Sequence, residues 1–438
     1  MKKTVLIGTA LLLVQIPLLA LVLLQERTWG GPQFDEGSGV ATAPDNSVYV
    51  TGTTLSFGAG DRDAFLLKYD ATGALAWQRT FGTAPSEPFF RADEFGRAVA
   101  VSPDGQAIYI SGQFGNGSLF LARFDPAGTL VWQRTWGENG SIANGVAATN
   151  TDVYVTGGTS SLERQSDAIL LKFSAAGTLQ WNIAWGGEGF DNAHDVAVGT
   201  DGVYFSGETN SFNANDAFVA KVDPNGTVLW ARDWAALDRD GFPGLTSAFG
   251  VGTTADGGVV ITGNASDVGT LKNTILVKYN STGTLVWQKI GGPGFGGGLD
   301  VAEAADGALF VTGSILADTR DPEVFGGFAF VAEFGADGRK KKASTWGGSP
   351  NDSASGESIA ISPNGTIAVA GFVHAPPYVY GSVSNSSRDA DATSTDVFST
   401  APNPAGTVNT DPGGVVTTPI GSETYAGDTE AFFLRLQR

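Results

Sequence analysis

The chain has 438 residues, a formal net charge of −19 and no cysteine. The lack of cysteine excludes disulfide bridges, thiolate metal sites and a lipid-modified cysteine. The negative charge argues against nucleic acid or an anionic lipid surface as a direct partner, because phosphate binding needs clustered Lys and Arg. The high glycine content, 61 residues, is typical of many tight turns between half-buried strands.

The N-terminus carries a long apolar segment. Lys2 and Lys3 precede Val5–Leu24, which contains no charged residue. A helix of this length measures about 30 Å, one hydrocarbon thickness. Two interpretations stay open: an uncleaved signal anchor over residues 1–24, which the length favours, and a signal peptide cleaved after Ala20. Both place the rest of the chain outside the cytoplasmic membrane, in the periplasm or at the cell surface.

One unit recurs seven times along the rest of the chain, at a spacing of roughly fifty residues. Each copy contains a V-Y-V-T-G element, then a D-A-F-L-L-K-Y-D element, then a tight turn and an aromatic strand. The first element occurs at Tyr49–Gly52, Tyr109–Gly112, Tyr154–Gly157, Tyr204–Gly207, Val260–Gly263, Phe310–Gly313 and, degraded, Ile367–Gly371. A period of this length is typical of propeller blades and solenoid arrays.

Each copy is predicted to contain four antiparallel strands. In the first copy the apolar runs are Val40–Ala43, Val48–Thr51, Ala64–Tyr69 and Leu75–Thr80, separated by turn residues. No stretch after residue 24 shows helical periodicity, which disfavours a helical solenoid. Four such strands make one blade, so the sequence predicts an all-β, seven-bladed β-propeller over residues 23–438.

The two ends of the chain complement each other. Leu23–Trp29 matches the outermost strand of a blade, whereas the last copy ends after its third strand, Ala431–Leu436. We therefore expect both termini to build the seventh blade and to close the ring, which leaves few strand edges open.

The copies differ most in the loops expected on one face. The inner-to-second and third-to-fourth turns are short and share the other face. The longest of the variable loops is an insertion at 372–429 in the last copy. Two interpretations of it stay open: a solvated loop, or a docking flap anchored by Tyr378 and Tyr380. Phe89 and Phe90 lie in a second irregular segment on the same face. Variable loops and exposed aromatic residues favour this face as a contact surface.

The repeats resemble the SBBP-type β-propeller repeat family of bacteria and archaea. The likeness is close over Trp29–Gly73 and Trp185–Gly226 and weaker in the fifth copy, where Trp234–Ala236 replaces a Trp-Gly-Gly sequence. The resemblance implies a seven-bladed propeller and export from the cytoplasm. It implies no catalytic residues.

Residues with catalytic or metal-binding chemistry are few. The chain has two histidines, and His194 precedes an inner strand near the expected channel mouth. A Ca²⁺ ion could be held there by carboxylates, a hypothesis that selects Glu36, Glu94, Asp191, Asp300 and Glu357. The alternative is that Asp35, Glu94 and Asp191 recur with the repeat and fix loops by hydrogen bonding, and the regularity favours this interpretation.

Two classes of function follow. The favoured class is a noncatalytic scaffold, exported and membrane-anchored through residues 5–24, that binds a protein partner or an envelope component through its variable-loop face. An accessory subunit of a membrane complex is one such role. The alternative is a propeller that binds a ligand, Ca²⁺ or a substrate at the mouth of the central channel.

Overall fold

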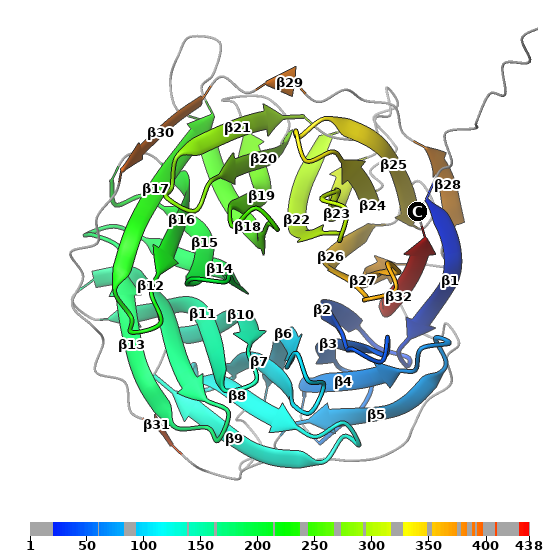
Figure 1. Ribbon diagram of the computed structural model, residues 1–438. Coiled ribbons are helices and arrows are strands. Elements are labelled where there is room, and N and C mark those ends of the chain that lie inside the picture. Colours follow the sequence, from blue (N-terminus) through cyan, green and yellow to red (C-terminus); the bar gives the residue numbers. More distant parts are fainter. Residues whose placement is uncertain are drawn as a thin grey trace, which may run out of the picture.

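The fold is known from a computed structural model, which describes residues 21–437 with gaps. The gaps are residues 60, 83–92, 138–139, 162–163, 213–214, 237–243, 267–272, 292–294, 317–326, 348–352, 375–377, 383–387, 390–391, 397–407 and 410–428. The described residues form seven antiparallel sheets arranged as blades around a central channel (Figure 1). The predicted all-β, seven-bladed propeller of four-stranded blades is confirmed.

Each of the first four blades has four strands of its own, which follow chain order from the channel outwards. The first blade contains β2 (Asp35–Thr42), β3 (Val48–Thr54), β4 (Asp63–Tyr69) and β5 (Leu75–Phe81). The second contains β6 (Glu94–Val101), β7 (Ile108–Phe114), β8 (Leu119–Phe124) and β9 (Leu130–Trp136). The third contains β10 (Ser141–Ala148), β11 (Asp152–Ser161), β12 (Arg164–Ser174) and β13 (Leu179–Trp185). The fourth contains β14 (Asp191–Val198), β15 (Val203–Thr209), β16 (Asp216–Val222) and β17 (Val228–Ala236).

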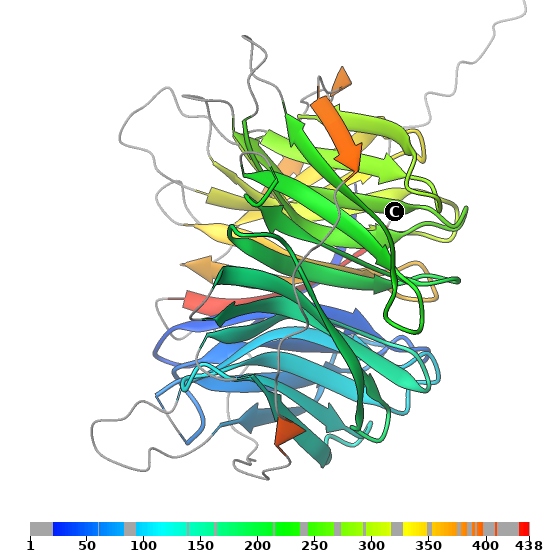
Figure 2. The ribbon, with the colours of Figure 1, turned by 90° about the vertical axis from the view of Figure 1, so that its left-hand side faces the viewer.

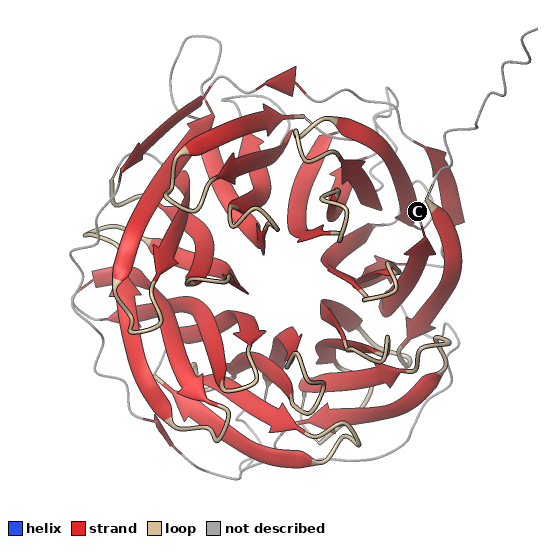
Figure 3. Cartoon of the chain, in the orientation of Figure 1, coloured by secondary structure: helices blue, strands red, loops and turns tan. Residues whose placement is uncertain are grey.

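The remaining blades are built in the same way around the channel (Figure 3). The fifth contains β18 (Leu245–Thr253), β19 (Val259–Ser266), β20 (Asn273–Tyr279) and β21 (Leu285–Ile290). The sixth contains β22 (Phe295–Glu303), β23 (Leu309–Leu316), β24 (Gly327–Phe334) and β25 (Lys340–Gly347). The seventh contains β26 (Ala354–Ile361), β27 (Ile367–His374), β32 (Thr429–Gln437) and β1 (Val22–Trp29).

The inner strands begin earlier than the sequence predicts. The first inner strand starts at Asp35 rather than at Val40. The added residues, Asp-Glu-Gly-Ser-Gly, have low intrinsic strand propensity, so sequence pattern alone does not mark them as strand. They become strand because the neighbouring strand β3 pairs with them from Asp35 to Thr42.

The seventh blade closes the ring with both ends of the chain. Strand β1 pairs antiparallel with β32, from Val22 opposite Gln437 to Trp29 opposite Ala431. Strand β32 in turn pairs with β27 from Thr429 to Leu436. The predicted closure is therefore confirmed, and the last blade has no missing outer strand.

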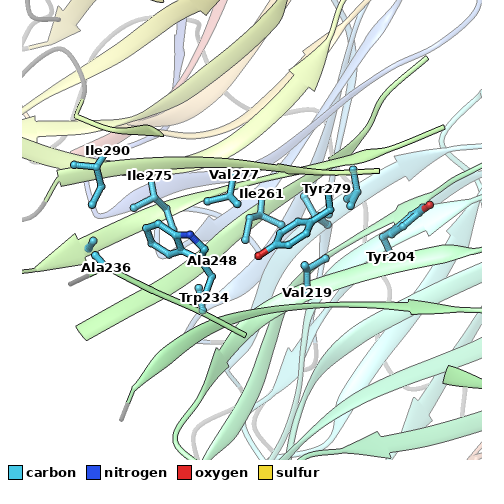
Figure 4. Close-up of a cluster of buried hydrophobic side chains, with 14 of the residues drawn as sticks. Tyr204, Val219, Trp234, Ala236, Ala248, Ile261, Ile275, Val277, Tyr279 and Ile290 are labelled. Carbon is cyan, nitrogen blue, oxygen red and sulfur yellow. The ribbon is translucent and has the colours of Figure 1, made fainter. Parts of the chain in front are cut away.

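The hydrophobic core consists of layers between neighbouring blades. Figure 4 shows one such layer, where Val219 and Trp234 of the fourth blade pack against Ile261 and Val277 of the fifth. All four side chains are fully buried. Each blade thus buries both faces, one against each neighbour, which is why its second and third strands are almost continuously apolar.

Tryptophans on the outer strands tie each blade to the next. In five blades the indole Nε1 donates a hydrogen bond of 3.0–3.2 Å to a backbone oxygen in the third-to-fourth turn of the following blade. The pairs are Trp77 with Pro126, Trp132 with Ala175, Trp181 with Pro224, Trp230 with Ser281 and Trp287 with Ala336. At the closure Gln25 takes this role and donates to the Gly73 oxygen.

The two faces of the disc carry different connections. Figure 2 shows the short hairpin turns on the right-hand face, as expected from the sequence. The blade crossings lie on the other face. There the amide of Phe190, in a crossing, donates a hydrogen bond to the side-chain oxygen of Asn210, in a second-to-third loop. Strand β1 begins at the short-turn face, because Val22 pairs with Gln437 at the end of β32.

Parts of the long insertion lie along the outer rim. Four short strands, β28 (Tyr378–Ser382), β29 (Arg388–Asp389), β30 (Ala392–Asp396) and β31 (Val408–Asn409), add to the outer strands of the sixth, fifth, fourth and second blades (Figure 1). Pairing of these short segments with the rim was not expected from the sequence, and the choice between a solvated loop and a docking flap stays open for the insertion. An outer strand presents unpaired backbone N–H and C=O groups, and the insertion pairs with them.

The N-terminal helix expected over residues 5–24 stays a prediction for residues 5–20. Residues 1–20 lie outside the described residues, and Val22–Leu24 belong to strand β1. In the described part of the chain, no helix has the length and apolar character needed to cross a membrane.

Trp29 provides a test of the closure. Its side chain is 2% exposed, and its Nε1 donates to Gln78 of the first blade over 2.8 Å. We expect Trp29→Ala to lower the free energy of unfolding by about 3–5 kcal/mol in urea titrations, because a large cavity opens between the first and last blades. Leu24→Ala in the same strand is the control, since Leu24 is 48% exposed. Equal losses for both variants would contradict the closure.

Candidate functional site

Each of the seven inner strands contains a β-bulge at the same position of the repeat. The bulge leaves one extra residue on the inner strand, and the next strand has no residue opposite it. These bulge residues are Ser38, Arg97, Asn144, His194, Phe249, Leu299 and Glu357. The frame is thus constant, whereas the residue at the bulge differs in every blade.

The recurring T-G pair of the V-Y-V-T-G element explains the bulge. A Cβ atom on its glycine would lie 1.8–2.0 Å from a carbonyl oxygen of the inner strand, two residues before the bulge. Only glycine allows this approach of the two backbones. In four blades the residue before this glycine is a threonine whose hydroxyl donates to the third strand, as Thr51 does to the Phe65 oxygen over 2.7 Å. The glycines are Gly52, Gly112, Gly157, Gly207, Gly263, Gly313 and Gly371.

The seven bulge residues line one cavity in the central channel. The cavity measures about 200 Å³, and every blade contributes to its wall. Phe249 and Leu299 form an apolar arc in the fifth and sixth blades, and polar or charged side chains occupy the other five positions. The channel is therefore amphipathic around its circumference.

Charged side chains are concentrated in the seventh, first and second blades. Burial raises the pKa of Glu357 to about 7, a hydrogen bond from Ser355 lowers it, and the nearby Glu36 raises it further. Burial also raises the pKa of Glu36, although the charge of Arg97 opposes this. The pKa of Arg97 is lowered by burial and raised by Glu36. Glu36 is thus the electrostatic neighbour of both other groups.

His194 lies at its bulge with an aromatic and an acidic neighbour. Its ring centroid is 4.9 Å from that of Phe249 in the next blade. Its Nε2 atom is 3.6 Å from Glu208 Oε1, and Ser247 donates to the other Glu208 oxygen over 2.7 Å. His194 is therefore part of the channel wall, and the structure shows no serine hydroxyl bonded to its ring among the described residues.

Two aspartates directly after a bulge connect neighbouring blades. Asp195 Oδ2 accepts from the Val251 amide over 2.9 Å, and Asp300 Oδ2 accepts from the Ile359 amide and from the Ser358 hydroxyl over 2.8 and 2.9 Å. Burial raises the pKa of both carboxyl groups, and Asp300 raises that of Asp195 further. These aspartates hold blades together and also contribute to the cavity wall.

The carboxylates selected for Ca²⁺ lie in different registers of the repeat. Glu36, Asp300 and Glu357 are within two residues of a bulge, but Glu94 and Asp191 begin their strands and are buried. Asp191 accepts from the Gly187 amide and the Ser211 hydroxyl of its own loops. Among the described residues, no group of three or more His, Asp and Glu side chains has an arrangement that could hold a metal ion. The Ca²⁺ site stays a prediction.

The described residues include only two of the predicted aromatic contact residues, Tyr378 and Tyr380. Phe89 and Phe90 lie outside the described residues. The backbone of Tyr378 pairs with Gly347 and that of Tyr380 with Thr345, so this segment lies on the rim of the sixth blade. Their role in binding a partner stays a prediction.

Most of the channel ring was not predicted from the sequence. His194 and Glu357 were expected near the channel mouth, but Ser38, Arg97, Phe249 and Leu299 were not. The sequence does contain a signal for these positions. Each bulge residue has a short residue on either side, and a Val or Ile follows two positions later, as in Gly-Arg-Ala-Val of the second blade. Reading that position across the copies identifies the ring.

The comparisons with known proteins support the fold alone. No protein-family model and no curated protein matches the sequence. The structure is similar to a chain of hydrazine synthase from Kuenenia stuttgartiensis, with a TM-score of 0.51 and 13% identity over 81% of this chain and 96% of that chain. The WD40 repeats of RRP9 give a TM-score of 0.49 and 12% identity over 80% and 91% of the two chains. The resemblance to the SBBP-type repeat family therefore stays a prediction.

The explanation of the bulge can be tested at Gly207, the glycine beside the bulge in the fourth blade. We expect Gly207→Ala to destabilise the protein by more than the 1–3 kcal/mol that is roughly typical of overpacking, because its Cβ would lie 1.9 Å from the backbone oxygen of Asn192. Thermal unfolding followed by circular dichroism measures the change. Gly327→Ala is the control, since the nearest atom to its Cβ is 3.6 Å away. A Gly207→Ala protein as stable as this control would contradict the explanation of the bulge.

The raised pKa of Glu357 predicts how stability changes with pH. The folded state holds the proton up to about pH 7, whereas the unfolded chain releases it near the ordinary value of 4.5. Between these values the unfolded state binds fewer protons, so the contribution of Glu357 to stability falls as the pH rises. In urea titrations from pH 4.5 to 8, Glu357→Gln should show a shallower loss of stability than the wild type. Parallel curves would contradict the assigned pKa.

Proposed function

We propose that the protein is a noncatalytic interaction scaffold outside the cytoplasmic membrane, which binds a protein partner or an envelope component through the face that carries the blade crossings. The observation that carries this proposal is the contrast between the faces. The short turns repeat from blade to blade. The second-to-third connections range from residues 162–163 in the third blade to the insertion between His374 and Thr429 in the seventh. Variation confined to one face favours a specific role for that face.

Exposed apolar side chains on the crossing face support the same surface. Phe190 and Leu245 are 40% and 54% exposed, and they precede or begin the inner strands of consecutive blades. Val131, Leu229 and Val286 are equally exposed, but they recur at one position of the outer strands and so belong to the repeat. Phe190 and Leu245 also share one register, four residues before the bulge, but they lie on the face whose loops vary from blade to blade, which favours a role in a contact made by that face.

The position of β1 fits an anchored scaffold. The strand begins at the short-turn face. An anchor formed by the apolar residues before β1 would therefore hold that face towards the membrane and leave the crossing face directed away from it. An accessory subunit of a membrane complex would present its contact surface in this way.

The partner surface can be tested by purification from native membranes in a mild detergent, with chemical cross-linking. The double variant Phe190→Ser and Leu245→Ser should lose a stoichiometric partner that the wild type retains, because its apolar contacts are removed. The double variant Val131→Ser and Val286→Ser on the rim is the matched control and should retain it. Loss in both variants, or a wild-type protein that purifies alone, would contradict the proposal. An intact N-terminal peptide with Lys2 and Lys3 is expected in the same preparation if the anchor is uncleaved.

A further inference from the structure

The channel cavity has a chemistry that the scaffold function does not require. Three consecutive blades supply Phe249, Leu299 and Glu357 to its wall, so that two apolar side chains stand next to a carboxylate. The other arc is polar and contains Ser38, Arg97, Asn144 and His194. A site of this kind matches a ligand with one charged group and a compact apolar part.

The size of the cavity limits the ligand to a small molecule. Drug-sized ligands occupy pockets of about 300–1,000 Å³. The channel cavity measures about 200 Å³, which is below this range. A peptide side chain or a metabolite of a few heavy atoms would fit into it, whereas a nucleotide would be too large.

The charges in and beside the cavity favour a cation. The single positive charge of Arg97 is outnumbered by four carboxyl groups, those of Glu36, Asp195, Asp300 and Glu357. Burial raises the pKa of each of these acids. A cation in the channel would relieve the repulsion between these carboxylates, and an anion would increase it. The net charge of −19 also attracts cations to the molecule.

The arrangement of the acids favours an organic cation over a metal ion. Within the described residues, the acids do not gather into a group of three or more that could hold a metal. The apolar arc provides no oxygen ligand, whereas Phe249 and Leu299 can pack against the alkyl carbon of an organic cation.

We propose that the central channel binds a small organic cation, with its ammonium group at Glu357 and its apolar part against Phe249 and Leu299. This site is independent of the scaffold function, because it lies in the channel and not on the crossing face. The bulge frame holds these three side chains on rigid inner strands, so the site is formed before the ligand arrives.

Binding should depend on pH through Glu357. Glu36 of β2 raises the pKa of this carboxyl group, and Ser355 of its own strand bonds to it. The other charged or titratable groups in the cavity wall are Arg97 of β6, His194 and Asp195 of β14 and Asp300 of β22. The Glu357 pKa of about 7 means that this group is mostly protonated at pH 6 and mostly ionised at pH 8. An alkylammonium ion keeps its charge over this range, so its affinity should rise about tenfold between the two pH values.

The test is isothermal titration calorimetry on the full chain, with isobutylammonium as the probe. Isobutanol and isobutyrate have similar shape but are neutral and anionic. We expect isobutylammonium to bind with a Kd at least about tenfold lower than that of either analogue. Its affinity should rise about tenfold between pH 6 and pH 8. Glu357→Gln should weaken binding about tenfold at pH 8 and make the pH dependence smaller, the remainder coming from Asp195 and Asp300, whose pKa values burial also raises. Glu188→Gln, which removes an exposed carboxylate outside the channel, should bind like the wild type.

The proposal is overturned if isobutylammonium does not bind, if isobutanol or isobutyrate binds as tightly, or if Glu357→Gln keeps the wild-type affinity. Circular dichroism of Glu357→Gln checks that the variant is folded, and Leu299→Asn provides a second variant if it is not. Leu299→Asn should weaken isobutylammonium and leave methylammonium unchanged, because only the apolar contact is altered. The scaffold proposal is judged separately by partner retention, which these channel variants should not change.

Discussion

The close contact between two backbones at each bulge is the constraint on which the channel depends. Seven glycines in second strands approach inner-strand carbonyl oxygens so closely that no Cβ atom fits between them. Each contact fixes an extra residue on the inner strand. The side chain of that residue is not part of the layers between blades, to which all four strands contribute other residues. The bulge therefore converts a sequence repeat into seven positions that are free to vary.

The frame keeps its shape because blades are connected at two radii. Near the channel, residues such as Gly145 and Gly250 bring consecutive inner strands together, with Asp195 and Asp300 bonding to amides of the next blade. At the rim, indole groups donate to the turns of the next blade. Because buried contacts at both radii stabilise the ring, a substitution at the bulge changes the chemistry of the channel with little effect on packing.

The repeat made the architecture predictable from the sequence. Seven copies, four strands per copy and a split last blade follow from periodicity, and the pairing of Val22–Trp29 with β32 confirms the split. The channel ring was harder to predict, because a bulge shifts the register by one residue and obscures strand alternation. Glu94 and Asp191 were therefore grouped with Glu36 and Glu357, although they begin their strands. The rim strands of the insertion could not be predicted, since a Ser- and Thr-rich sequence pairs only when an open strand edge is beside it.

Variation among copies within one chain distinguishes structural positions from candidate functional positions. Asp35, Asp191 and the outer-strand tryptophans recur because each copy must fix the same loop or bond to the same neighbour. The bulge residues share no such requirement, and all seven differ. Each blade contributes one side chain to the ring around the cavity, and equivalent backbones fix its position. The residue type at each of the seven positions can therefore change independently of the others. The selectivity of the ring is then set by which neighbours stand together, and here an aromatic ring, an alkyl group and a carboxylate occupy three consecutive blades.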